Sequence, residues 1–444
     1  MTNHATAPFH RRSSILIMIL LGFLLSLTWN VSAQKGESVP ADQIDGDIAA
    51  KWMDELYRLV QAETINAPAA SRIYGYAGVA LYESVVNGMP GNYSLAGQVQ
   101  DLPDMPLPQD MRVYDWPSVA NGTMSTVIEG LFDDPSEETV AAIAALREEQ
   151  SEARTADVGS EVVERSVAYG DELAAALLAW IAADGYADNL GREYELPTGD
   201  PSLYVRTTDG APLIGAYWGE LRPLGLSYAE VCNVPLNVPF SEDSDSTFYA
   251  QADEVREVGD NLTTEQEDIA RFWLDTPGQT GAPAGHWVSI ENQLVEQLDL
   301  NLQQAAGMYS LVGMALADSF ISIWALKYEV LLLRPETYIR AYISRSWQPY
   351  IQTPPFPEYP SGHSGTSAAA AEILTSLFGA VAFTDRTHII YDHEPLQRSF
   401  TSFEAAASEA AISRMYGGIH YRAAIENGMR QGRCIGQQIL QNVQ

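Results

Sequence analysis

Two cations in the last third of the chain have the spacing to hold a small oxyanion. Lys327 and Arg334 lie seven residues apart in the segment KYEVLLLRP. Seven residues advance a helix by about 700°, so both side chains fall on one face, roughly 10 Å apart. Pro335 disfavours helical geometry at Arg334, so we expect the helix to end there and the guanidinium to reach beyond it. Two long cations can enclose one anion, but two surface cations are the simpler interpretation of this pair alone.

A second motif, Ser361-Gly362-His363, follows a proline-rich approach and precedes an alanine-rich run. The run is a strong helix former, so the motif is predicted to lie at a helix N-terminus, where free N–H groups and the dipole favour an anion. Gly362 permits close backbone approach, Ser361 offers a hydroxyl, and His363 exchanges a proton near neutral pH. A serine cap beside an incidental histidine explains this motif equally well.

A third motif pairs Arg414 with His420 across Gly417 and Gly418. On an unbroken helix, two side chains six residues apart point about 120° away from each other. The glycine pair lets the chain turn, so that Arg414 and His420 can converge on one ligand. Taken alone, an arginine at a helix end and a capping or core histidine explain the motif somewhat better.

Helices must position these motifs, because apolar residues recur at helical spacing almost throughout the chain. The sequence predicts helices over residues 48–62, 68–86, 135–154, 158–183, 287–298, 303–333, 363–378, 404–416 and 421–440, with helical character returning at 263. Repeated prolines predict an irregular stretch over about 185–260. We therefore predict an all-α protein with helical bundles packed in one large domain. It comprises an N-terminal helical region (34–260) and a catalytic bundle (261–444).

Residues 1–33 are predicted to be a signal peptide, because a basic start precedes an apolar run and a small-residue cleavage site. The mature protein is expected to be exported, periplasmic or secreted, with no membrane association. The chain has 25 Lys+Arg against 58 Asp+Glu, a net charge of −33, which argues against nucleic acid as a partner. Cys232 and Cys434 could form one long-range disulfide or remain two buried thiols, and the sequence favours neither.

Together the three motifs resemble the signature shared by vanadium-dependent haloperoxidases and type 2 phosphatidic acid phosphatases. That signature reads Lys, six residues, Arg-Pro; then Pro-Ser-Gly-His; then Ser-Arg, five residues, His. Trp324 stands three residues before Lys327, as in fungal-type vanadium chloroperoxidases, and FPEYPSGH resembles their equivalent segment. The segments 68–85 and 270–287 are similar to bacterial exported members of the haloperoxidase branch.

The resemblance implies a vanadate cofactor. By position, His420 would be the axial vanadium ligand, His363 the acid–base group and Lys327 the residue that polarises bound peroxide. The equatorial oxygens would be bound by Lys327, Arg334, Ser361, Gly362 and Arg414. The residue types agree, since vanadate needs several donors, compensating cations and one neutral imidazole nitrogen. In this family vanadium acts as a Lewis acid, and hydrogen peroxide oxidises halide to hypohalous acid, which halogenates small organic acceptors.

The same pocket could instead hydrolyse phosphate monoesters, with His420 as nucleophile and His363 protonating the leaving group. Phosphatase members usually carry Asp four residues after the final His, where this chain has Ala424. That difference weakens the phosphatase alternative, unless another carboxylate substitutes. A third alternative is an exported helical protein that binds phosphate or vanadate without catalysis.

Phe356 and Ser364, together with Trp324, are predicted to form the substrate pocket. Phe356 matches the residue of chloroperoxidase-like members, whereas Ser364 replaces their common Ala and resembles bacterial iodide-oxidising relatives. A hydroxyl at 364 could hydrogen-bond peroxide or His363 and lower the oxidising power of the site. We therefore expect iodide and bromide turnover, with chloride weak or absent. The sequence leaves the natural acceptor and the oligomeric state open, a homo-oligomer included.

Four other polar residues are assigned structural or solvated roles. His286 is expected to bond to backbone near the site, and Asp275 to be a helix-end carboxylate or the partner of a pocket arginine. His388 and His393 are predicted to be solvated side chains of a loop over the pocket.

Overall fold

Helices dominate the part of the chain that the computed structural model describes, residues 37–208, 210 and 212–443. Within it, only β1 (Phe383–Asp385) and β2 (Arg398–Phe400) are strands, and they pair antiparallel with Phe383 opposite Phe400. The predicted all-α class and the single large domain are therefore confirmed. The predicted signal peptide lies outside the described residues.

The N-terminal part of the described chain contains five long helices and three short ones. Its elements are η1 (Ala41–Gln43), α1 (Asp47–Ala62), α2 (Ala67–Val85), η2 (Val86–Gly88), α3 (Trp116–Leu131), α4 (Glu137–Val158), α5 (Ser160–Ile181) and α6 (Tyr186–Asn189). The second half contains η3 (Trp218–Glu220), η4 (Ala229–Cys232), α7 (Thr247–Asp260), α8 (Thr264–Phe272), α9 (Ala282–Gln297), α10 (Leu302–Val330), α11 (Pro335–Tyr342), α12 (Gly362–Phe378), α13 (Thr387–Ile390), α14 (Phe403–Tyr416) and α15 (Arg422–Asn442).

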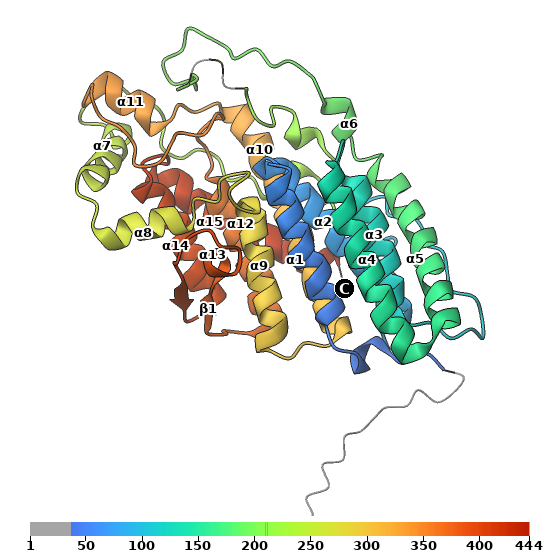
Figure 1. The fold of residues 1–444 in the computed structure, drawn as a ribbon. Helices are drawn as coiled ribbons and strands as arrows, with labels where there is room; N and C mark the ends of the chain where they lie inside the picture. The colour runs from blue at the N-terminus through green and yellow to red at the C-terminus, as the bar shows by residue number, and fades with distance from the viewer. Residues whose placement is uncertain (1–36, 209, 211, 444) are drawn as a thin grey trace, which may run out of the picture. The chain divides into compact units, whose positions relative to one another are not determined.

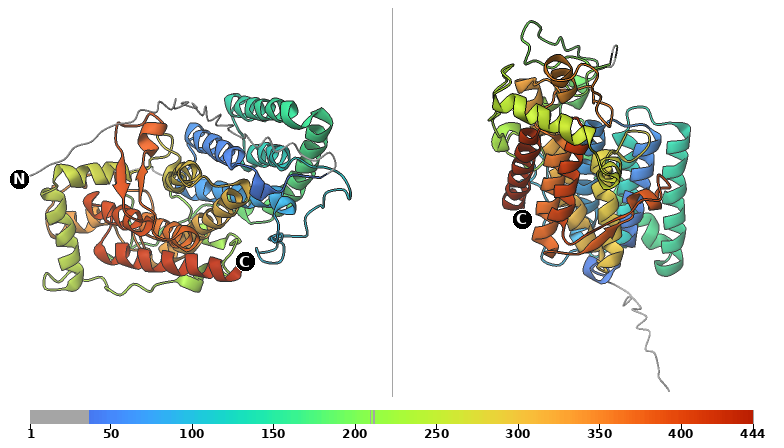
Figure 2. Two further views of the ribbon diagram at one scale, coloured as in Figure 1. Left: turned by 90° about the horizontal axis from the view of Figure 1, so that it is seen from below. Right: turned by 90° about the vertical axis from the view of Figure 1, so that its left-hand side faces the viewer.

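Helix α10 is the central element of the fold. It packs along α2 on one side and against α12 and α15 on the other. Figures 1 and 2 show α1 to α5 gathered on one side of the molecule and α12, α14 and α15 on the opposite side. A Cβ at Gly78 would overlap the carbonyl oxygen of Tyr309, so only glycine lets α2 approach α10 this closely.

The apolar character of α10 reflects its burial. Among the described residues it is the one helix long and apolar enough to cross a membrane, and 89% of its most apolar window is buried inside the protein. A helix that is apolar on all sides is expected at the core of a large domain. Its last two turns carry Trp324 and Lys327 to the end of the core.

Several helices and a strand pair differ from the sequence prediction, α11 and α13 among them, where no helix was predicted. Helix α3 lies where none was predicted, and α7 lies inside the stretch predicted to be irregular. The helix predicted to run to residue 333 ends at Val330, because Leu331 adopts a left-handed conformation. Pro335 then starts α11 at a position where its missing N–H costs nothing. Strands β1 and β2 flank the segment predicted to be a loop.

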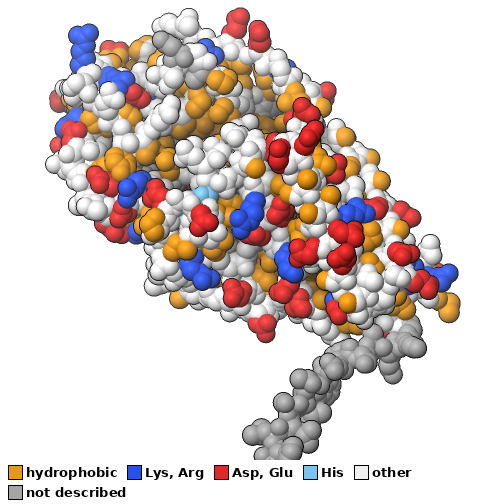
Figure 3. All heavy atoms as spheres, in the orientation of Figure 1, with side chains coloured by type: hydrophobic (Ala, Val, Ile, Leu, Met, Phe, Trp, Pro, Cys, Tyr) orange, Lys and Arg blue, Asp and Glu red, His pale blue; other side chains and the backbone are white. Residues whose placement is uncertain are grey.

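On the face shown in Figure 3, acidic and basic side chains are scattered among hydrophobic ones, with acidic groups prominent. The same view shows hydrophobic side chains gathered in a hollow in its upper half. Exposed acidic groups carry the net charge of −33, which keeps polyanionic partners away from the surface.

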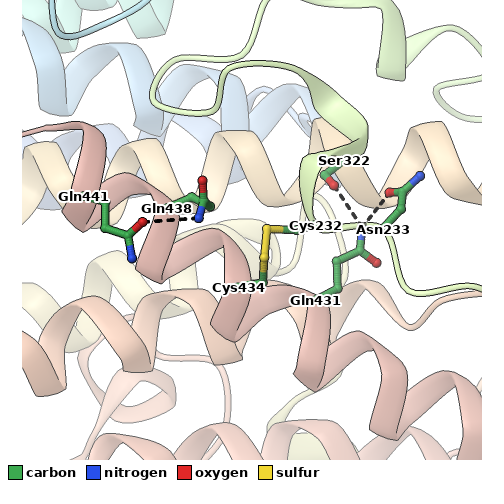
Figure 4. The surroundings of a disulfide bond; sticks show 7 residues. All are labelled: Cys232, Asn233, Ser322, Gln431, Cys434, Gln438 and Gln441. Carbon is green, nitrogen blue, oxygen red and sulfur yellow. Dashed lines mark hydrogen bonds between the residues drawn. A yellow bond between two sulfur atoms is a disulfide. The ribbon is translucent and has the colours of Figure 1, made fainter.

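Cys232 and Cys434 form a disulfide that joins η4 to α15 (Figure 4). The alternative of two buried thiols is therefore wrong. Beside the disulfide, the Gln431 amide donates to Ser322 Oγ at 2.9 Å and Asn233 Oδ1 at 3.3 Å. The covalent bond and these hydrogen bonds hold the irregular middle of the chain against the C-terminal bundle.

Candidate functional site

A cavity of about 710 Å³ opens where the three motifs meet. Gly362, His363, Arg414 and His420 line it, and Trp324 and Phe356 contribute from the predicted substrate pocket. The other predicted residues are fully buried behind this surface rather than along it: Lys327, Arg334, Ser361 and Ser364. The three motifs therefore meet at one cavity. Some of their residues line it, and the others are buried behind the lining.

Local chain geometry explains how Arg334 and the serine–glycine–histidine motif reach this place. Arg334 caps α11 in an extended conformation, three residues after the left-handed Leu331. Ser361 caps α12, and its side chain accepts from the backbone N–H of Ser364 at 3.3 Å. The N–H groups of Gly362 and His363, in the first turn, have no intrahelical acceptor and so remain available to an anion.

The glycine pair turns the chain between Arg414 and His420. Helix α14 ends at Tyr416, and Gly418 has a φ of +76° that a side chain would rarely adopt. Arg414, at the end of α14, and His420, just before α15, thus face the same cavity. An unbroken helix would have pointed them apart.

His420 is held in one tautomer by a buried carboxylate. Its Nδ1 lies 2.8 Å from Glu358 Oε1, which also accepts from the backbone N–H of Tyr421 at 2.9 Å. Burial is the main cause that holds the pKa of His420 well below its usual range, and the nearby charges of Arg334 and Lys327 add to it. A neutral ring that donates through Nδ1 keeps a lone pair on Nε2. That nitrogen is suited to bind a Lewis acid.

Glu358 is the functional residue that the sequence reasoning missed. It belongs to the FPEYPSGH segment and is fully buried, and burial raises its pKa to about 7, while Arg334 and Lys327 oppose this. It supplies the carboxylate that Ala424 cannot, whereas the carbonyl of Ala424 accepts from the N–H of Ser361. The sequence held one signal for this role. Glu358 is the one acidic residue in the FPEYPSGH segment, and Ala424 left His420 without the usual carboxylate partner.

Arg334 and Lys327 place positive charge behind His420. Arg334 donates through Nη1 to Ile419 O at 2.9 Å and to His420 Nε2 at 3.1 Å. Its Nη2 is buried and finds no partner in the described part of the chain. Burial lowers the pKa of Arg334 to about 10, so the guanidinium stays charged at neutral pH.

The Lys327 amine is enclosed by backbone carbonyls. Its Nζ donates to the carbonyl oxygens of Pro357, Glu358 and Pro360 at 3.0, 2.9 and 2.5 Å. Burial lowers its pKa well below the usual range, but three acceptors match the three N–H bonds of an ammonium. In this structure Lys327 therefore anchors the segment 357–360 and contributes charge, and it offers no free donor to the cavity.

Arg414 and His363 both line the cavity. Arg414 donates to Ser413 Oγ at 2.8 Å and to Trp273 O at 2.5 Å, and burial lowers its pKa to about 10. Burial and the charge of Arg414 hold the pKa of His363 well below its usual range. Its Nε2 is buried without a partner among the residues described. A neutral imidazole with an unused nitrogen can accept a proton from a ligand.

Ser364 does not lie where the sequence analysis placed it. Its hydroxyl is fully buried and bonds to Ser361 Oγ at 2.8 Å, so it contacts neither the cavity nor His363. Trp324 and Phe356 form a wall, with ring centroids 5.0 Å apart. Lys327 Nζ lies 5.3 Å from the Phe356 ring, within range of a cation–π attraction.

The other histidines in the described part of the chain make contacts that the sequence analysis did not predict. His286 bonds to carboxylates instead of backbone, through Nδ1 to Asp275 at 2.9 Å and Nε2 to Asp385 at 2.8 Å. Burial works against its charged form, but the two carboxylates outweigh it and raise the pKa to about 10. His388 is not solvated, because its Nε2 contacts Phe272 O at 2.8 Å. His393 is half-buried and contacts Tyr57 Oη at 3.1 Å.

These groups suit a tetrahedral oxyanion better than a bare metal cation. Within the described ranges there is no group of three or more His, Cys, Asp or Glu side chains that could hold a metal ion. The floor instead combines cationic guanidinium groups, first-turn N–H groups and one oriented imidazole. The unpartnered Arg334 Nη2 and His363 Nε2 are buried polar atoms that an anion bound here could satisfy.

Comparisons with known proteins agree with this arrangement. A family model described as the VCPO second helical-bundle domain matches residues 307–444. The chain shares 33% identity and a TM-score of 0.83 with a structure described as the first bacterial vanadium-dependent iodoperoxidase, covering 90% of this chain and 97% of that one. No curated protein matches by sequence.

Two more distant structures share the fold. Holo and apo forms of a bacterial vanadium-dependent chloroperoxidase match with TM-scores of 0.60 and 0.62, at 15% and 14% identity. Each match covers 85% of this chain and 93% of the other. The fold and the iodoperoxidase match together define the class: the chain belongs to the vanadium-dependent haloperoxidase family and is an enzyme of that kind.

Proposed function

We propose that the protein binds vanadate in this site and uses hydrogen peroxide to oxidise iodide, and bromide less readily, to hypohalous acid. The observation that carries the proposal is the neutral His420, oriented by Glu358 and set among buried cations. The similarity to a bacterial vanadium-dependent iodoperoxidase supports iodide as a substrate. Vanadate, when bound, supplies a Lewis acid that activates peroxide toward halide.

The residues divide the work of binding. His420 Nε2 would hold the metal, and Arg334, Arg414 and the backbone N–H groups at the start of α12 would hold the oxygens. Ser361 would contribute its hydroxyl, which Ser364 orients. Lys327 would act through its charge and by fixing segment 357–360.

His363 is the proposed proton carrier. Halide, hydrogen peroxide and one proton give hypohalous acid and water, so a group beside the peroxide must take up and return a proton. His363 is neutral, lines the cavity and has an unused Nε2. It would take a proton from peroxide at that nitrogen and return it to the oxygen that leaves as water.

Reconstitution of apo-protein with orthovanadate tests the proposal. We expect peroxide-dependent triiodide formation that depends on added vanadate, because the site offers donors for one tetrahedral oxyanion. Phosphate should compete, since it has the same shape and charge, and a tenfold excess should lower vanadate loading several-fold. Vanadate loading that is unaffected by high phosphate would contradict a shared oxyanion site.

Phosphate ester hydrolysis deserves measurement beside this assay. The Glu358–His420 pair gives the chain a carboxylate that orients the histidine, although position 424 carries Ala. A phosphomonoester such as 4-nitrophenyl phosphate would place its phosphorus where vanadium would bind, with His420 as nucleophile. Turnover of that ester by apo-protein, inhibited by vanadate, would support this second activity.

Halide range is a separate prediction. Iodide should be oxidised fastest, bromide more slowly and chloride at background, because iodide and bromide lose electrons more easily. Ser364→Ala should lower vanadate affinity by about 2- to 10-fold without changing that order, because the lost hydrogen bond acts on Ser361. Ser376→Ala, on the exposed side of α12, is the matched control. Chloride turnover comparable to iodide turnover in the parent would contradict the prediction.

We also propose that the protein is exported. The sequence of residues 1–33 has the pattern of a signal peptide, and the Cys232–Cys434 disulfide suits an oxidising compartment. Detection of a mature N-terminus at Gln34 in periplasmic or culture fractions would test this.

A further inference from the structure

The cavity is much larger than halide and peroxide require. Its volume is about 710 Å³, and a water molecule occupies about 30 Å³ in the liquid. Peroxide and one halide would fill only a small part of this space. Binding sites for small organic molecules typically have volumes of about 300–1,000 Å³, and this cavity lies within that range.

The cavity wall is mostly apolar and partly aromatic. Phe320, Trp324 and Phe356 follow one another along it, with ring centroids 4.9 and 5.0 Å apart. Five prolines and the side chains of Ile214 and Leu274 extend the apolar surface. Successive aromatic faces and proline rings favour a flat apolar ligand that can stack or meet them edge-on.

Polar groups lie both at the mouth of the cavity and at its floor, and Asp275, Thr276 and Thr353 also line it. Four lining residues are exposed to solvent and mark the mouth: Arg271, Gln279, Tyr350 and Gln352. Arg414, His420 and the backbone of Gly362 are buried and form the floor of the proposed oxyanion site. A molecule that entered through the mouth would cross the apolar wall before reaching the place where hypohalous acid forms.

The buried arginines at the floor and the apolar wall together favour an uncharged ligand. Arg334 and Arg414 place positive charge around the floor, which disfavours organic cations. An organic anion would have to place its charged group against the apolar wall of the cavity, which costs desolvation energy. A neutral molecule meets neither barrier.

We propose that an uncharged, electron-rich aromatic molecule of the phenol class binds in this cavity and is halogenated there. The inference rests on the proposed function, which supplies hypohalous acid. A ring carbon forms a bond to the halogen while the halogen–oxygen bond breaks. The hydroxide released takes the proton from that ring carbon and leaves as water. Binding the acceptor beside the floor makes the reaction selective, whereas freely diffusing hypohalous acid would not discriminate.

Two neighbouring residues provide a matched pair of variants. Ile214 lines this cavity, whereas Leu213 lines a second cavity of about 560 Å³ behind the same segment. The carbonyl of Ile214 accepts from Trp324 Nε1 at 3.1 Å and from Tyr328 Oη at 2.8 Å, so the backbone here is fixed. Ile214→Gln would make the acceptor wall polar, and Leu213→Gln would make the same change on the other side.

The test is a competition between 4-cresol and 4-hydroxyphenylacetate, two phenols with similar rings and different charge. The ratio of iodinated products is measured with the enzyme and with hypoiodous acid generated chemically in the same buffer. We expect the enzyme to favour 4-cresol at least about fivefold over the reagent, a preference of about 1 kcal/mol. Ile214→Gln should return the ratio toward the reagent value, and Leu213→Gln should keep the parent ratio. Equal ratios for parent enzyme and reagent would overturn the proposal.

A binding measurement separates this proposal from the proposed function. NMR saturation transfer from the protein to 4-cresol requires no halide oxidation. We expect transfer with the parent and with Leu213→Gln and weaker transfer with Ile214→Gln. No transfer to 4-cresol in the parent would overturn the acceptor site even if triiodide forms. Transfer without triiodide formation would support the acceptor site and contradict the proposed function.

Discussion

Replacement of His420 by alanine should reduce vanadate-dependent iodide oxidation to background. His420 is the residue whose neutral imidazole lines the cavity with Nδ1 committed to Glu358 and Nε2 directed at the cationic groups. Arginine and backbone donors can attract an oxyanion, but they provide no lone pair for a metal. We therefore expect the variant to lose vanadate loading as well as turnover, measured by reconstitution and triiodide formation.

The control must show that the loss is local. Removing the ring leaves Glu358 with the Tyr421 N–H as its remaining hydrogen-bond donor in the structure, so the thermal midpoint of the variant should be measured beside its activity. His393→Ala is a suitable comparison, because His393 is half-buried and does not line the cavity. It should retain parent activity. Vanadate-dependent turnover by folded His420→Ala would refute the role of His420.

Helical periodicity predicted the all-α fold. It did not predict the helices that are stabilised by packing against their neighbours rather than by their own sequence pattern. Helix α3 is buried over almost its whole surface and contains glycine, serine and threonine, so it has neither a polar face nor high intrinsic propensity. Helix α7 follows a proline-rich stretch that suggested continued irregular structure. Both helices are stabilised mainly by their neighbours, which a local pattern cannot show.

The candidate site was predictable to the extent that its residues share local motifs. Arg414, His420, His363 and Gly362 reach one cavity as the glycine break and the helix start suggested. The carboxylates were not predictable in the same way. His286 pairs with Asp385, which lies 99 residues away along the chain, and Glu358 meets His420 across 62 residues. Only the packed bundle brings such partners together.

Glu358 should prove nearly as important to vanadate binding as the histidine it orients. Glu358→Ala removes the acceptor of the His420 Nδ1–H bond, so either ring nitrogen could carry the proton and the ring could turn. Loss of such an orienting partner typically costs 10- to 100-fold in metal affinity or activity, and we expect about that loss here. Glu358→Gln keeps an oxygen that can accept from His420 and Tyr421 but removes the charge, so its loss should be smaller.

The order of these variants distinguishes orientation from charge. Vanadate affinity should fall from parent to Glu358→Gln to Glu358→Ala, and equal losses in both variants would mean that the charge dominates. The ¹⁵N shifts of His420 report the tautomer directly, and a general loss of stability would not move them. Glu336→Gln is the control, because Glu336 is also buried but bonds Thr353 and Arg340 rather than His420. If Glu358→Ala kept both parent affinity and the Nδ1–H tautomer, another group would have to orient the ring, and Glu358 would serve only to balance the charge of Arg334 and Lys327.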